Sequence, residues 1–300
     1  MKTIVFAFPG NESLAHVLCT GIAAEQGTAI FRRFPDKESY VQIRNDVAQK
    51  HVVIVCSLQE PNDKFLSLFF FCKLAKDLKA TTISLVAPYL AYMRQDKQFN
   101  TGEAVTSNYF ASLLSSFVDR LITIDPHLHR INSLEDIYSI PCEIIHASLL
   151  ISKWIKKNVA NALIIGPDSE SEQWVSMVAK EAGAPYVVLQ KIRKGDKNVE
   201  IAFPNLERFK HFTPVLVDDI ISTAHTMIET IQHLIDLKMN PPICIGVHAV
   251  FAGSAFKELS SSGAQSIITC NTIAHESNGI DISETIIKSL NAFNYESNRI

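Results

Sequence analysis

The sequence predicts an α/β protein made of two similar domains, each with a mostly parallel sheet flanked by helices. Short apolar runs rich in β-branched residues recur along the chain, and several are continuous, which is typical of strands buried on both faces. Helical patterns separate these runs, as βαβ crossovers require. The length of 300 residues suits about two domains of ordinary size.

Each expected element follows from its local pattern. Apolar, β-branched runs predict strands at residues 3–8, 52–56, 82–87, 120–124, 162–165, 186–190, 215–217, 243–247 and 266–270. Apolar residues at helical spacing predict helices at 61–78, 107–116, 147–158, 170–182 and 226–237. A further helix is expected near 282–290.

The two predicted domains meet after residue 147. A similar alternation of strands and helices runs through residues 1–147 and through residues 148–300, and no glycine- or serine-rich linker marks the boundary. The sequence leaves open whether the segment from 282 onward packs back onto the first domain.

Charge and hydropathy exclude several function classes. The net charge is −3, and no run of basic residues stands out, so we expect no nucleic acid partner. The most apolar segment, 65–72, is too short to span a bilayer, and the first residues do not form a signal peptide. The six cysteines form no CxxC pair and lie mostly in apolar runs. We therefore expect a cytoplasmic protein with reduced thiols and no membrane partner.

The most informative segment is VLVDDIISTAHTM, residues 215–227. An apolar strand ends in two adjacent carboxylates, Asp218 and Asp219, and a small, polar segment then opens a helix. That segment consists of Ser222, Thr223, Ala224, His225 and Thr226. A helix N-terminus offers free amides and a positive dipole end to a phosphate, while carboxylates accept hydrogen bonds from sugar hydroxyls. The alternative, an aspartate-rich turn with a helix cap, explains only one or two of these residues.

This segment resembles the phosphoribosyl-binding signature of type I phosphoribosyltransferases, in which two acidic residues hold the ribose hydroxyls and the following loop holds the 5-phosphate. Other segments resemble motifs of the ribose-phosphate pyrophosphokinase family, in the family's order. They are FPDKES at 34–39, PND at 61–63, PYLAYMRQDKQF at 88–99 and TIDPHLH at 123–129. The resemblance covers nearly the whole chain. It implies transfer of the pyrophosphoryl group of ATP to the 1-hydroxyl of ribose 5-phosphate, with release of AMP.

The resemblance assigns ATP binding to two segments, one that contacts the nucleotide and its phosphates and one that holds adenine and ribose. The matching residues are Arg94, Gln95 and Asp96 in the first segment and Phe34, Asp36 and Glu38 in the second. In the family the second segment comes from a neighbouring subunit. A homo-oligomer with a shared nucleotide site is therefore implied, with its size left open.

The resemblance also assigns the metal and the catalytic residues. His127 and Asp168 match positions near Mg²⁺, which is expected to bridge the triphosphate oxygens. Lys191 and Arg193 resemble the K-x-R pair of the family's catalytic loop. That pair would neutralise the charge that develops in the transition state.

Each of these residues also has a purely structural interpretation. Arg94 could pair with Asp96 on a surface turn, His127 could be a core histidine, and Asp168 could cap the next helix. The basic stretch that holds Lys191 could be a solvated hairpin tip. Only the joint occurrence of the motifs in the family's order favours the functional interpretation.

Two loops depart from the family's pattern. Ala224 and His225 occupy the glycine place of the ribose-phosphate loop. Such a loop works without glycine if its φ angles stay negative, and His225 is a candidate donor to the 5-phosphate. The loop at 168–172 carries Glu170 and Glu172, which repel a triphosphate unless magnesium intervenes.

Three functions are compatible with these motifs: an active pyrophosphokinase, a non-catalytic regulatory relative, and a nucleobase phosphoribosyltransferase. Regulatory relatives typically lose the K-x-R pair or the acidic pair, and both are present here. A nucleobase phosphoribosyltransferase needs neither the RQD and FPDKES segments nor a second α/β half. The sequence therefore favours the active enzyme.

Overall fold

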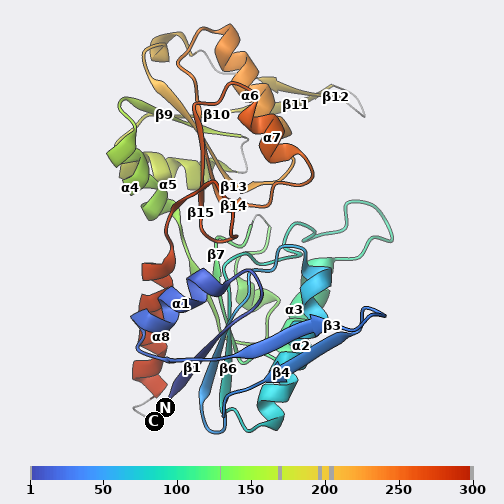
Figure 1. Ribbon diagram of the computed structural model, residues 1–300. Coiled ribbons are helices and arrows are strands. Elements are labelled where there is room, and N and C mark those ends of the chain that lie inside the picture. The colour runs from blue at the N-terminus through green and yellow to red at the C-terminus, as the bar shows by residue number, and fades with distance from the viewer. Residues whose placement is uncertain (1, 129, 168–170, 195–197, 203–205, 298–300) are drawn as a thin grey trace. The chain divides into compact units, whose positions relative to one another are not determined.

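The computed structural model describes residues 2–128, 130–167, 171–194, 198–202 and 206–297, with 190–194, 198–202 and 294–297 described by their backbone alone. The chain divides into two compact units (Figure 1). The first consists of Met1–Ile145 together with Ile282–Ile300, and the second of His146–Asp281. In the part of the chain just given, no helix is long and apolar enough to cross a membrane.

The first unit is built on a six-stranded parallel sheet in the order β2-β1-β5-β6-β7-β8. Its strands are β1 (Thr3–Ala7), β2 (Glu25–Gln26), β5 (His51–Val55), β6 (Thr82–Ala87), β7 (Arg120–Ile124) and β8 (Cys142–Ile145). Its helices are α1 (Glu12–Gly21), α2 (Pro61–Asp77), α3 (Thr106–Ser115) and α8 (Ser283–Ser297). A separate antiparallel hairpin of β3 (Ala29–Arg33) and β4 (Ser39–Ile43) packs along α2.

The second unit repeats this plan, with a six-stranded parallel sheet in the order β10-β9-β13-β14-β15-β16. Its strands are β9 (Ala162–Gly166), β10 (Tyr186–Val188), β13 (Thr213–Ile221), β14 (Ile243–Ala249), β15 (Ser266–Cys270) and β16 (Asn278–Ile280). Its helices are α4 (Ser148–Asn158), α5 (Glu172–Ala182), α6 (His225–Asp236) and α7 (Ala255–Ser260). An antiparallel hairpin of β11 (Gln190–Lys194) and β12 (Asn198–Ala202) again stands apart from the sheet.

The two units correspond element by element. β1, α1 and β2 match β9, α5 and β10; the hairpin β3–β4 matches β11–β12; and β5 and α2 match β13 and α6. Strands β5 and β7 are buried along their whole length, which explains their continuous apolar sequences. The predicted class, two similar α/β domains with parallel sheets, is confirmed.

The helix that follows the last sheet strand of each unit in the chain packs in the other unit. Helix α4 follows β8 in the chain but packs on α5 in the second unit. Helix α8 follows β16 but packs on α1 in the first unit (Figure 1). The structure therefore differs from the predicted division into 1–147 and 148–300, because α8 packs on α1 in the first unit.

Helix α8 is anchored at two places. A methyl group added at Gly21 of α1 would lie 2.3 Å from Cδ1 of Ile287, so the absence of a side chain at Gly21 lets the two helices approach. One turn and a half further on, the ring of Phe293 lies 4.5 Å from the guanidinium carbon of Arg120 and 5.0 Å from the ring of His51. These contacts hold α8 against α1, β5 and β7.

Five of the six cysteines are buried, and Cys142 is half-buried. All six cysteines are free. Burial raises the pKa of Cys56 and of Cys244 to about 12, so both thiols stay protonated and unreactive at neutral pH.

We predict that Gly21→Ala destabilises the protein even though alanine normally favours a helix. The added methyl overpacks the contact with Ile287, at a cost of roughly 1–3 kcal/mol, and lowers the Tm measured by calorimetry. Ile287→Val removes Cδ1, so the double variant loses less than the sum of the two single losses. Strictly additive losses would contradict the close approach.

Candidate active site

The predicted ribose-phosphate segment lies at the carboxyl end of β13. This strand runs to Ile221 and is longer than the predicted 215–217, so Asp218 and Asp219 lie within it rather than after it. The reason is that β13 is a central strand, and its pairing with β14 continues to Ile221 and Ala249 despite the poor strand propensity of aspartate. Both carboxylates are half-buried. Oδ1 of Asp218 accepts a hydrogen bond from the amide of Asp219 over 3.0 Å.

The phosphate loop turns sharply at Ala224. This residue precedes α6 with φ 59° and ψ 4°, a left-handed conformation that favours glycine. The condition of negative φ, under which such a loop works without glycine, is therefore not met at this position. In the part of the chain that the structure describes, no side-chain hydrogen bond caps the start of α6, so its first amides are available to bind an anion. Thr223 and His225 beside them are exposed, whereas Ser222 and Thr226 are half-buried.

In the first unit, the loop after β6 positions Arg94, Gln95 and Asp96. Oγ1 of Thr106 donates a hydrogen bond to Oε1 of Gln95 over 3.2 Å, which joins the loop to the start of α3. The carboxylate of Asp96 is only 4% exposed and pairs with Arg130 over 3.2 Å. Arg94 remains exposed to solvent. The loop is thus fixed by Gln95 and Asp96, and Arg94 is presented outward.

The loop after β7 carries His127 and meets the loop after β6, because β6 and β7 are neighbours in the sheet. The ion pair between Asp96 and Arg130 joins the two loops. Asp125 and His127 both have positive φ, 33° and 57°, although neither is glycine. Such strained residues cluster at functional sites.

Two residues of this region escaped the sequence analysis as site candidates. Asp125 is a carboxylate at the end of β7 and is only 7% exposed. The sequence did contain a signal for Asp125, because this residue begins the D-x-H motif. Arg130 had no signal, because its partner Asp96 is 34 residues away in the chain.

The turn of the β3–β4 hairpin presents Phe34, Asp36 and Glu38. The amide of Phe34 donates to the carbonyl of Glu38 over 2.8 Å, and the amide of Lys37 donates to the carbonyl of Phe34 over 2.9 Å. Oδ1 of Asp36 accepts from the amide of Glu38 over 3.2 Å. A turn closed by three hydrogen bonds holds its side chains in a defined direction.

Arg32 fixes the ring of Phe34. Its guanidinium carbon lies 4.7 Å from the ring centre of Phe34 and 4.0 Å from that of Tyr40. Arg33 pairs with Asp63 over 2.8 Å, which fastens the hairpin to the start of α2. The ring of Phe34 is still 40% exposed, so it can stack against a planar ligand.

The predicted catalytic stretch is a strand rather than a loop. Lys191 and Arg193 lie in β11, paired with Ile201 and Val199 of β12. The difference arises because the whole stretch from 190 to 194 finds antiparallel partners in β12, which a local pattern does not reveal. Asp168 lies outside the described residues.

A magnesium site made by the protein alone is not required for this chemistry. Among the described residues, no three His, Cys, Asp or Glu side chains are grouped to hold a metal. Magnesium that is carried by a triphosphate usually takes only one or two carboxylates from the protein and keeps several waters. Carboxylates at strand ends, such as Asp125, have the oxygen donors that such an ion prefers.

The parallel sheets, the hairpins and the uncapped helix that follows an acidic strand end define an α/β protein of the phosphoribosyltransferase type. Residues 3–117 match the model for the N-terminal domain of ribose phosphate pyrophosphokinase, and residues 133–284 match the phosphoribosyl transferase domain. The chain belongs to the ribose-phosphate pyrophosphokinase family. The resemblance seen in the sequence motifs is thereby confirmed.

Individual relatives cover most of the chain. The ribose-phosphate pyrophosphokinase of Sulfolobus acidocaldarius is 32% identical, with 86% of this chain and 89% of the relative aligned. Ribose-phosphate pyrophosphokinase 2 of Archaeoglobus fulgidus is 30% identical, with 94% and 98% aligned. The crystal structure of phosphoribosylpyrophosphate synthetase from Mycobacterium smegmatis shares the fold, with a TM-score of 0.87 at 20% identity over 99% of this chain and 100% of that one.

We predict that the stability of the phosphate loop depends on the backbone conformation of residue 224. Ala224→Gly relieves about 1–2 kcal/mol of left-handed strain and gives up the burial of one methyl, about 0.8 kcal/mol, so the Tm stays level or rises. Ala224→Val lowers the Tm, because a branched side chain resists positive φ. Thr223→Val, at an exposed neighbour, is the control and leaves the Tm unchanged. A valine tolerated as well as glycine would disprove the strained turn.

Proposed function

We propose that the protein transfers the pyrophosphoryl group of ATP to the 1-hydroxyl of ribose 5-phosphate, giving phosphoribosyl pyrophosphate and AMP. One observation carries this proposal: in a chain of the ribose-phosphate pyrophosphokinase family, the acidic pair Asp218–Asp219 leads directly into the uncapped N-terminus of α6. The cysteine pattern and the absence of a spanning helix among the described residues support a cytoplasmic location.

Ribose 5-phosphate fits the chemistry of the β13–α6 segment. The carboxylates of Asp218 and Asp219 accept hydrogen bonds from the 2- and 3-hydroxyls, and the free amides of α6 take the 5-phosphate. Ser222, Thr223 and Thr226 add hydroxyl donors, and the exposed His225 adds a ring nitrogen. In this arrangement the 1-hydroxyl is left for reaction.

ATP is assigned to groups of the first unit. The exposed Arg94 contacts the phosphates, and its loop is held by Gln95 and Asp96. The ring of Phe34 stacks on adenine, while Asp36 and Glu38 accept hydrogen bonds from the nucleoside. These hairpin residues serve the site of a neighbouring copy.

The reaction is an in-line displacement in which the 1-hydroxyl oxygen attacks the β-phosphorus and AMP leaves. Its rate depends on positioning and on charge neutralisation. Lys191 and Arg193 neutralise the charge that develops on the phosphoryl oxygens. His127 and Asp168 would hold magnesium, which would supply further neutralisation of the phosphate charge.

A turnover assay tests this function. ATP, magnesium and ribose 5-phosphate are mixed with the protein and AMP release is followed; no AMP at any phosphate concentration would refute the proposal. Lys191→Ala lowers kcat by about a hundredfold or more and leaves ATP binding nearly unchanged, because the charge it neutralises appears only in the transition state. A rise in KM alone would instead show Lys191 to be a binding residue.

A shared site requires association between copies, and the first unit offers a suitable surface. Helices α2 and α3 pack together through Phe65 and Phe110, with ring centres 5.3 Å apart. Their outer sides carry large exposed apolar residues four positions apart on each helix. These are Leu66 and Phe70 on α2 and Tyr109 and Leu113 on α3. Adjacent apolar stripes of this kind favour a homo-oligomeric contact.

Mixing two inactive variants tests the shared site. Phe34→Ala copies lack the adenine contact and Lys191→Ala copies lack the catalytic cation. If each site takes Phe34 from one copy and Lys191 from another, co-refolded mixtures regain about a quarter of wild-type sites. A mixture no more active than its separate components would place both residues in the site of one copy. Light scattering on the same samples gives the oligomer size.

A further inference from the structure

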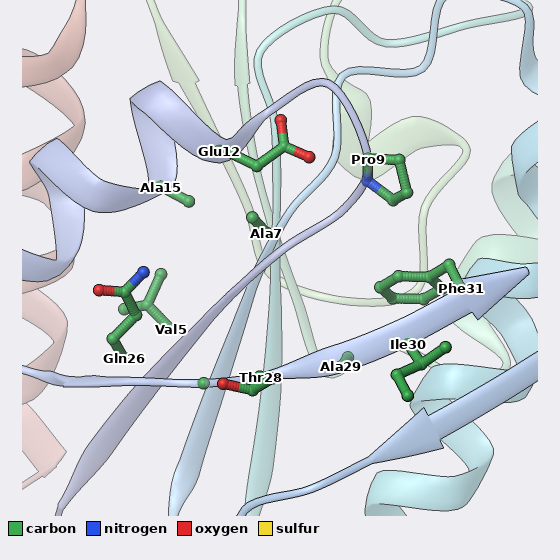
Figure 2. Close-up of a pocket in the computed structure, with 11 residues that line it drawn as sticks. Val5, Ala7, Pro9, Glu12, Ala15, Gln26, Thr28, Ala29, Ile30 and Phe31 are labelled. Atoms are coloured by element: carbon green, nitrogen blue, oxygen red, sulfur yellow. The ribbon is translucent and has the colours of Figure 1, made fainter.

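The first unit contains a cavity of about 490 Å³ to which the proposed reaction gives no role (Figure 2). It lies between β1, the start of α1 and the stretch that leads from β2 into β3. Its volume falls within the range of small-molecule binding sites. Figure 2 shows Ala7 near the middle, with Glu12 on the α1 side and Thr28 and Ala29 on the opposite side.

The cavity occupies a place that has a counterpart in the second unit. It is formed by β1, α1 and β3, which correspond to β9, α5 and β11. In the second unit, β11 carries the proposed catalytic residues. The first unit therefore places uncharged residues of β3 beside its cavity, where the equivalent strand of the second unit carries the proposed catalytic residues.

The charges at the two places differ. Ile30 and Lys191 are in equivalent positions. Each follows the first paired residue of its hairpin, which is Ala29 in β3 and Gln190 in β11. None of the residues that line the cavity is a lysine, arginine or histidine, and its one charged residue is Glu12. A phosphate here would find no cationic side chain among the lining residues and would be repelled by the carboxylate of Glu12, which opposes the attraction of the nearby start of α1, so the cavity favours ligands without phosphate.

The floor of the cavity is an unpaired strand edge. In a parallel sheet, both backbone groups of one residue point to the same side, and successive residues alternate. The amide of Phe8 bonds Val55 of β5, whereas the carbonyl of Val5 bonds the amide of Gly27 over 2.8 Å on the other side. The ladder with β2 ends at Val5, so Ala7 presents both its N–H and its C=O toward the cavity with no partner among the described residues.

These groups suit a planar heterocycle. The N–H and C=O of Ala7 lie side by side and match a ring edge that carries an acceptor next to a donor, as purine bases do. The ring of Phe31 lines the cavity, and its orientation is fixed by Phe8, whose ring centre is 4.5 Å away. Oε1 of Glu12 accepts from the amide of Gly10 over 3.1 Å, which leaves Oε2 for an amino or sugar hydroxyl donor.

We propose that this cavity binds a purine base, free or as its nucleoside, without phosphate. The ring edge pairs with Ala7, the ring lies against Phe31, and Glu12 accepts a hydrogen bond. The site is separate from the proposed catalytic residues, so its failure would leave the proposed reaction untouched.

Hydrogen exchange with mass spectrometry tests this site on the full chain, with adenine, adenosine and AMP as probes. Adenine or adenosine slows exchange in peptides that contain Ala7, because its free amide gains a partner. AMP protects the same peptides at least about tenfold more weakly, since its phosphate meets Glu12. Protection by adenine alone or by adenosine alone supports the site, and the stronger probe shows whether ribose is recognised.

Two matched variants separate this site from indirect effects. Glu12→Gln weakens the apparent affinity roughly tenfold and leaves AMP release in the turnover assay unchanged. Glu284→Gln, in the first turn of α8 in the same unit, is the control and changes neither the apparent affinity nor AMP release. No protection by adenine or adenosine at 10 mM, an unchanged apparent affinity in Glu12→Gln, or equal protection by AMP would each overturn the proposal.

Discussion

Parallel strand pairing determines where this protein can do chemistry. All six strands of each sheet run in one direction, so their carboxyl ends meet at a single edge, and the polar residues that follow them gather there. The ion pair between Asp96 and Arg130 is a direct consequence. The two residues follow neighbouring strands and come together although 34 residues separate them. The same constraint brings the acidic strand end of β13 to the carboxyl edge of the second sheet.

The repeated plan allowed the two units to acquire different charges on equivalent elements. Strand β13 carries Asp218 and Asp219 near its carboxyl end, whereas the equivalent strand β5 is followed by Cys56 and Ser57. Carboxylates can accept hydrogen bonds from sugar hydroxyls, whereas a buried thiol beside a serine is typical of a protein core. The proposed sugar site thus lies in one unit, while the aromatic and cationic side chains proposed to bind ATP lie in the other. Helix α4 follows the last strand of the first sheet but packs in the second unit, and α8 follows the last strand of the second sheet but packs in the first.

Much of this arrangement could be predicted from the sequence. Parallel strands that are buried on both faces have apolar residues at successive positions, and such runs are easy to recognise. Strands β6, β7 and β15 were predicted at their observed bounds. Short edge strands such as β2 and β16 were missed, since a strand of two or three residues is too short to show a pattern. The β3–β4 hairpin was missed as well, because its stability comes from contacts with α2 that are distant in sequence.

The candidate site divides in the same way. Residues within a motif, such as Asp218 and Arg94, were identified because their neighbours in the chain formed the family's pattern. Arg32 and Arg130 were not, because each acts through a side chain on another segment. The strand character of Lys191 and Arg193 depends on pairing with β12, which local sequence does not encode. Positioning residues are thus the part of a site that only the fold reveals.

The scarcity of glycine acquires a physical meaning in the structure. Only 11 of 300 residues are glycine, yet the loops after β6, β7 and β13 all pass through the left-handed region. They use Tyr92, His127 and Ala224, at a cost of about 1–2 kcal/mol each. Side chains at these positions limit the alternatives open to the backbone more than glycine would. A loop that is strained but well packed is already close to its binding conformation, so less ordering entropy is lost when phosphate binds. The missing glycines therefore favour preorganised loops, and after β13 this fixes the start of α6, where the proposed function places the 5-phosphate.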